Sequence, residues 1–140
     1  MRTKTTLLAG AASAALLTLA ISCGGSSSTT SPTAPTTPTA ACTPSSSPTT
    51  IVIQNNQVCP STLTVPRGTQ VTIVNNDSRT HEMDSDPHPE HTDCVELNQI
   101  DFLNPGQSRQ SGNLNIAKKC GFHDHNQPGT AALKGTITIQ

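Results

Sequence analysis

Four short runs in which apolar and polar residues alternate, rich in β-branched side chains, constrain the fold of this chain most strongly. They are residues 51–54, 62–65, 71–74 and 136–139. A period of two is typical of strands that bury one face and expose the other. Asn, Asp, Pro and Gly residues separate the runs and indicate turns, and helical periodicity is absent. The pattern predicts a small all-β domain over residues 50–140, an antiparallel sandwich or barrel.

The distribution of charge excludes one class of partner. The chain has eight Lys and Arg residues and nine Asp and Glu residues. Eight of the nine acids lie between Asp77 and Asp101, and no basic patch offers a surface for nucleic acid. The sequence also lacks a nucleophile elbow, a phosphate-binding glycine loop and a zinc-protease helix motif. We therefore expect no nucleic-acid partner and no enzymatic activity.

Residues 1–22 are typical of an export signal. Arg2 and Lys4 precede an apolar run from Leu7 to Leu19 that is too short to cross a bilayer comfortably. The residues that lead into Cys23 resemble a bacterial lipoprotein processing site. This resemblance implies a lipid on Cys23 and an exported protein anchored to the membrane of the cell envelope. The alternative is an ordinary signal peptide that leaves Cys23 as a spare thiol.

Residues 23–49 are expected to form a disordered tether. They are nearly all Ser, Thr, Pro, Gly and Ala. Such a segment cannot bury enough apolar surface to offset the entropy lost on ordering. Cys42 is the exception, because it places a reactive side chain in an otherwise inert stretch.

All five histidines lie between residues 81 and 125. Residues 82–100 are expected to form a long, polar loop broken by prolines, and a loop of this length is more often functional than structural. His88 and His91 in this loop are candidate metal ligands, although solvated loop residues are the plainer interpretation. Met83 is a candidate soft ligand, or simply a residue that fills the core.

Three segments together resemble the cupredoxin family, the plastocyanin and azurin group. Residues 58–69 are similar to the opening strands of these proteins, and residues 71–81 to the strand that ends before the first copper histidine. Residues 105–137, with Cys120-Gly121-Phe122-His123, are similar to the hairpin that carries the other ligands. The resemblance implies a Greek-key β-sandwich.

The resemblance also implies a copper site. It assigns His81, Cys120 and His123 as ligands, the His₂Cys set of a type 1 centre, and hence one-electron transfer with a redox partner protein that the sequence does not identify. Leu133 stands where the family commonly has an axial methionine. His125, next to the motif, is a further candidate ligand.

The number of cysteines favours a different arrangement. If Cys23 carries lipid, four cysteines remain, and an exported protein with four cysteines commonly forms two disulfides. In a cupredoxin topology the pairs Cys42–Cys59 and Cys94–Cys120 are geometrically reasonable. The second pair would remove the thiolate and leave a copper-handling module with histidine ligands. A metal-free β-sandwich used as an interaction module is the third hypothesis.

Overall fold

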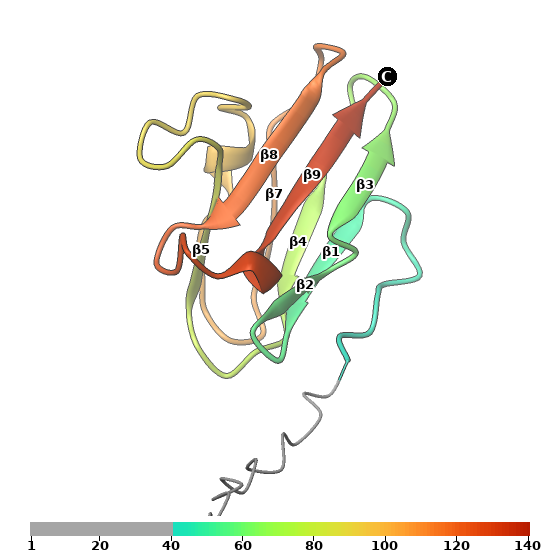
Figure 1. Ribbon diagram of the computed structural model, residues 1–140. Helices are drawn as coiled ribbons and strands as arrows, with labels where there is room; N and C mark the ends of the chain where they lie inside the picture. Colours follow the sequence, from blue (N-terminus) through green and yellow to red (C-terminus); the bar gives the residue numbers. More distant parts are fainter. Residues whose placement is uncertain (1–40) are drawn as a thin grey trace, which may run out of the picture. The chain divides into compact units, whose positions relative to one another are not determined.

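The computed structural model describes residues 41–140. The predicted export signal, Cys23 and residues 24–40 of the predicted tether lie outside the described residues. Within residues 41–140, two β-sheets pack face to face (Figure 1). None of the helices in this part of the chain has the length and hydropathy of a membrane span.

One sheet has four strands in the order β2-β1-β4-β7. Asn55 and Asn56, with φ of 55° and 58°, form the two-residue turn of the β1–β2 hairpin, and a positive φ at both positions is what such a turn requires. The four strands are β1 (Thr50–Gln54), β2 (Gln57–Cys59), β4 (Thr72–Asn75) and β7 (Ser108–Gln110).

The other sheet has five strands in the order β3-β9-β8-β5-β6. These strands are β3 (Thr62–Val65), β5 (His81–Ser85), β6 (Asp101–Leu103), β8 (Lys119–Asp124) and β9 (Lys134–Ile139). Two short 3₁₀ helices, η1 (Leu97–Gln99) and η2 (Ala131–Leu133), precede β6 and β9. The all-β sandwich predicted from the alternating runs is confirmed.

Two details differ from the expected fold. The pairs β1–β4 and β3–β9 are parallel, so the sheets are mixed rather than antiparallel. Parallel neighbours need a long connection, and here the intervening chain crosses to the other sheet and back. In addition, residues 82–85 belong to β5 and not to the expected loop.

The core between the sheets is made mainly of aliphatic side chains, with Phe122 as its one buried aromatic among the described residues. Phe122 lies opposite Gly135 in the β8–β9 register. A side chain at position 135 would overlap the Phe122 ring. The absence of a side chain at Gly135 therefore leaves room for the Phe122 ring, and the packed ring holds β8 against the core.

The folded part extends upstream of Thr50, into the end of the predicted tether. Cys42 forms a disulfide with Cys59 of β2, with the two Cα atoms 6.0 Å apart. The backbone N–H of Thr43 donates to Oε1 of Gln54 at 3.1 Å. Residues 42 and 43 are thus held against the β1–β2 hairpin.

Candidate metal centre

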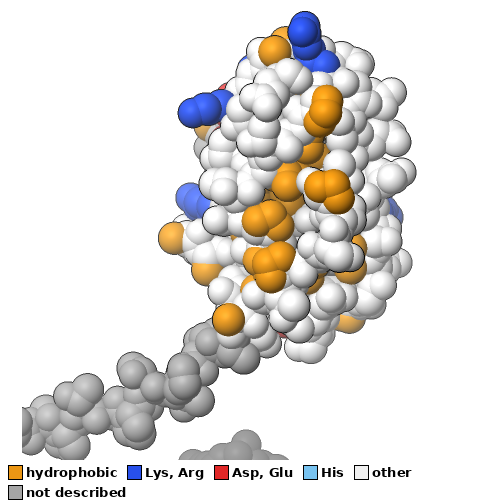
Figure 2. All heavy atoms as spheres, turned by 90° about the vertical axis from the view of Figure 1, so that its right-hand side faces the viewer, with side chains coloured by type: hydrophobic (Ala, Val, Ile, Leu, Met, Phe, Trp, Pro, Cys, Tyr) orange, Lys and Arg blue, Asp and Glu red, His pale blue; other side chains and the backbone are white. Residues whose placement is uncertain are grey.

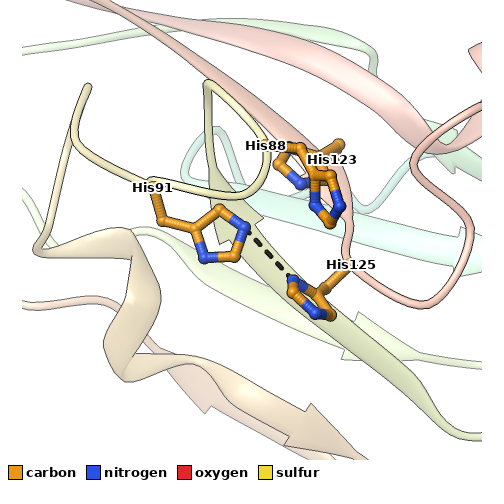
Figure 3. A group of neighbouring side chains, drawn as sticks. All are labelled: His88, His91, His123 and His125. Atoms are coloured by element: carbon orange, nitrogen blue, oxygen red, sulfur yellow. Dashed lines mark hydrogen bonds between the residues drawn. The ribbon is translucent and has the colours of Figure 1, made fainter.

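Four histidines converge on one side of the sandwich. His88 and His91 come from the loop after β5, and His123 and His125 from the end of β8 (Figure 3). Each can offer one ring nitrogen such that all four nitrogens lie within 4.8 Å of one another. We call these four residues the histidine cluster.

The pairing of β5 with β8 explains how two of these rings reach the same side. Phe122 and Asp124 are buried in the sandwich, and successive side chains of a strand point to opposite faces. His123 therefore points to the outer face of the sheet, where it lies opposite Asp84 of β5. The His-x-His spacing directs His125 to the same outer face.

A loop formed by residues 86–94 lies over this outer face and is closed by its own backbone. The N–H of Asp93 donates to the carbonyl of Asp86 at 2.7 Å, and the N–H of His91 to the carbonyl of Pro87 at 2.7 Å. Asn98 braces the loop, because its amide donates to the carbonyl of His91 and accepts from the N–H of Ser85, both at 2.9 Å. The loop is thus a fixed support for the two rings that it carries.

The disulfide Cys94–Cys120 fastens this loop to β8. Cys94 ends the loop and Cys120 lies in β8, with their Cα atoms 5.7 Å apart. Both cysteines are fully buried on the core side of the sheet. The bond joins the segment that carries His88 and His91 to the strand that carries His123.

One ring nitrogen of the cluster is both buried and unpaired. His123 is 1% exposed, and its Nδ1 lies 2.6 Å from Oδ1 of Asp86. Because a carboxylate only accepts, this Nδ1 donates, which leaves the lone pair on Nε2. Nε2 has no hydrogen-bond partner, although buried polar atoms are nearly always satisfied. A histidine held through Nδ1 by a carboxylate, with Nε2 free, has the form of a metal ligand.

The other contacts in the cluster are between imidazoles or with Asp84. Nε2 of His91 lies 3.2 Å from Nδ1 of His125 (Figure 3). Oδ2 of Asp84 lies 3.5 Å from Nδ1 of His91 and 3.7 Å from Nδ1 of His125. A metal ion bound by these rings would replace the hydrogen bond between His91 and His125.

His81 lies apart from the cluster, fully buried in the sandwich. Its Nδ1 is 2.6 Å from Oδ2 of Asp124, and its Nε2 is 3.3 Å from Oδ2 of Asp77. Both ring nitrogens are therefore engaged by carboxylates. The Asp77 carboxylate also accepts the backbone N–H groups of Asn56 and Ser78.

The pKa of Asp77 reflects these contacts. Burial acts to raise it, but the N–H donors of Asn56 and Ser78 and the neighbouring His81 outweigh burial and hold the pKa below its ordinary value. Asp77 thus stays ionised and fixes the loop between β4 and β5. His81 serves here as a structural link between that loop and β8.

The structure does not assemble the ligand set that the resemblance implied, namely His81, Cys120 and His123. Cys120 is bonded to Cys94. It also points to the opposite face from His123, because β8 runs on to Asp124 without leaving the sheet. An offset of three residues in a continuous strand always separates two side chains in this way.

Two other residues that the sequence analysis named lie in the core. Met83 is buried on the opposite face of β5 from Asp84, so its sulfur does not reach the cluster. Leu133 is also buried. Asp84 and Asp86 were not predicted to support the metal site, although their period-two spacing matches that of His123 and His125 and marks one strand face.

The chemistry of the cluster fits a metal ion of intermediate softness. Four imidazoles suit Cu(II) or Zn(II), and an ion bound through Nε2 of His123 would give that atom the partner that it lacks. Negative charge surrounds the cluster as well. The pKa of Glu82, on the same strand as Asp84, is raised by burial and by Asp84, Asp101 and Asp124, and His125 opposes this only in part.

The right-hand side of the domain as drawn in Figure 1 has a different character. The face shown in Figure 2 carries a band of apolar side chains with Lys and Arg near its upper end, and no histidine is visible on it. The acidic and histidine-bearing side is therefore the one to which a cation would be attracted.

Comparison with known proteins gives a relative at the level of sequence. No family model matches the chain. Over 84 residues the chain is 37% identical to plastocyanin from Scenedesmus fuscus, which covers 58% of this chain and 84% of that protein.

Solved structures agree on the fold. A purple cupredoxin from Nitrosopumilus maritimus matches with a TM-score of 0.50 and 20% identity, over 65% of this chain and 98% of its own. Oxidised plastocyanin from Dryopteris crassirhizoma matches with a TM-score of 0.51 and 20% identity, over 65% and 99%. A mutant amicyanin matches with a TM-score of 0.51 and 16% identity, over 65% and 80%. At these identities the likeness shows the fold alone.

We expect the Cys94–Cys120 disulfide to support the cluster. Replacing both cysteines by Ala should lower the free energy of unfolding by about 2–5 kcal/mol and weaken Cu(II) binding, because the loop with His88 and His91 is released from β8. Urea unfolding and calorimetric titration measure the two effects. The matched control replaces Cys42 and Cys59 by Ala, which should cost stability but leave Cu(II) affinity unchanged. Equal Cu(II) affinities in both double variants would contradict this role.

We expect Asp77 to stabilise the fold in a pH-dependent way. A carboxyl whose pKa is lowered on folding contributes stability above its unfolded pKa, and this contribution disappears as the pH falls through the folded pKa. Asp77→Asn should therefore cost about 1–3 kcal/mol at pH 7, and the cost should shrink below the ordinary value of 3.8. Urea unfolding followed by circular dichroism from pH 7 to pH 3 tests this. A cost that does not change with pH would show that ionisation of Asp77 is not the cause.

Proposed function

Because the chain belongs to the cupredoxin family, we propose that it binds copper, and that the histidine cluster on the outer face of the five-stranded sheet is the binding site. The observation that carries the proposal is the set of four ring nitrogens within 4.8 Å of one another. The buried, unpaired Nε2 of His123 supports it further. Copper bound there would supply one-electron redox chemistry, while the protein positions the ring nitrogens that hold it.

The residues of the cluster have distinct parts in binding. His123 is buried and fixed by Asp86, so it provides the preorganised inner ligand. His125 is 35% exposed and His88 is exposed, so copper would enter and leave on their side. The closed loop over β8 limits rearrangement of the donors. This arrangement supports the capture and handling of copper in preference to chemistry on a bound substrate.

One-electron transfer is the second candidate function. Membership of the cupredoxin family favours it, and the exposed His88 and His125 would bring a redox partner close to the metal. In this function too the ligands are imidazoles, because Cys120 is bonded to Cys94. Cyclic voltammetry of the copper-loaded protein tests it: a reversible one-electron wave supports electron transfer, and an irreversible response that strips the metal counts against it.

Substitution of individual histidines tests the proposed site. The purified protein should retain about one copper per chain after gel filtration, and His88→Ala or His125→Ala should reduce the retained copper several-fold by removing a donor. His81→Asn is the matched control, because it removes a buried imidazole that lies outside the cluster. The metal content is measured by mass spectrometry of the eluted protein. Copper retained by the His125 variant but lost from the folded His81 variant would contradict the assignment and favour an interior site.

We also propose that the protein is exported and held at a membrane by a lipid on Cys23. The support is the export signal that the sequence predicts in residues 1–22, together with the two disulfides, a kind of bond that persists in oxidising compartments. Labelling of expressing bacterial cells with a fatty acid should mark the wild type and spare Cys23→Ser. An unlabelled wild type recovered in the aqueous fraction would contradict the anchor.

A further inference from the structure

We propose that Asp84 and Asp86 make the histidine cluster selective for a divalent ion over a monovalent one. This inference rests on the proposed function, since it concerns the same site. Neither carboxylate is needed as a ligand, because the four imidazoles already supply four donors. They act through their negative charge, because each carboxylate contacts one or two of the imidazole rings and favours a bound cation.

Asp86 contacts the ring of His123. Its Oδ1 accepts from Nδ1 of His123 at 2.6 Å. The Asp86 side chain lies over Gly121, and any side chain at position 121 would overlap its carboxylate. The glycine thus leaves the space through which Asp86 reaches the ring.

Asp84 contacts two other rings of the cluster, those of His91 and His125. Its side chain is 10% exposed, and Oδ2 lies 3.5 Å from His91 and 3.7 Å from His125. Among residues 41–140, no Lys or Arg lies within ion-pair distance of Asp84 or Asp86. The nearest ionisable partners of the two carboxylates are thus the rings of the cluster.

The charges then match one kind of ion. The four imidazoles, taken as neutral ligands, and the two carboxylates in contact with them carry a formal charge of −2, which a divalent cation cancels and a monovalent cation does not. Little screening reaches a carboxylate as buried as Asp84, so an unbalanced charge there is costly.

Sulfur, which would favour Cu(I), is kept away from the cluster. Met83 points into the core, and Cys94 and Cys120 are joined to each other in the core. Cu(I) prefers thiolate and thioether ligands, whereas imidazole suits Cu(II) and Zn(II). Donor type and charge therefore favour the same divalent ions. The two carboxylates account for the share of this selectivity that comes from charge.

The test measures three affinities in the full-length protein: for Cu(II), for Cu(I) and for Zn(II), each by competition with a chromophoric chelator. Asp84→Asn and Asp86→Asn should lower the affinity for Cu(II) and Zn(II) by roughly 10–100-fold, the range seen when a group behind a metal ligand is changed. The affinity for Cu(I) should change much less. A tenfold loss specific to Cu(II) raises the Cu(II)/Cu(I) potential by about 59 mV, so voltammetry gives an independent readout.

Glu90→Gln is the matched control, because it removes an exposed acid from the same loop and should leave the ratio of Cu(II) to Cu(I) affinity unchanged. Equal losses for Cu(II) and Cu(I), or a loss for Cu(II) without one for Zn(II), would overturn the inference. If the buried Asp84 variant does not fold, Asp86, whose side chain is 40% exposed, carries the test. A wild type that binds none of the three ions would instead refute the proposed function.

Discussion

Side chains along β8 alternate between the core and the outer face, and this alternation decides which donors can meet. Cys120, Phe122 and Asp124 point into the sandwich, so the sulfur lies within reach of Cys94 and the carboxylate within reach of His81. His123 of the strand and His125 just after it are left on the outer face. The protein therefore separates sulfur from imidazole across the thickness of one sheet. A mixed Cys and His site would require the strand to end sooner.

The outer face becomes a site only because a loop is held over it. The disulfide fastens the end of the loop to β8 from the core side, and Asn98 braces it from within. Asp86, at the start of the loop, accepts from the ring of His123. The same short segment thus brings ligands, hydrogen-bond acceptors and negative charge to one place, and it needs no large hydrophobic surface to do so.

The sequence predicts the scaffold better than the site. Period-two runs such as residues 51–54 and 136–139 locate strands because one face of each is buried, and this information is local. The ligand set is not local. Cys120 and His123 can bind the same metal ion only if the chain leaves the sheet after the cysteine. No local signal in the sequence showed that β8 continues to Asp124. The roles of Asp84 and Asp86 likewise depend on pairing with β8, which residues far along the chain determine.

X-ray absorption at the copper edge of the Cu(II)-loaded protein identifies the atoms bound to the metal, and so distinguishes binding at the histidine cluster from binding elsewhere. Copper held by the histidine cluster should give a shell of nitrogen donors at about 2.0 Å, an ordinary metal–imidazole distance, with the outer scattering typical of several imidazoles and no sulfur. Sulfur among the atoms bound to copper, or fewer than three imidazoles, would show that copper binds outside the histidine cluster.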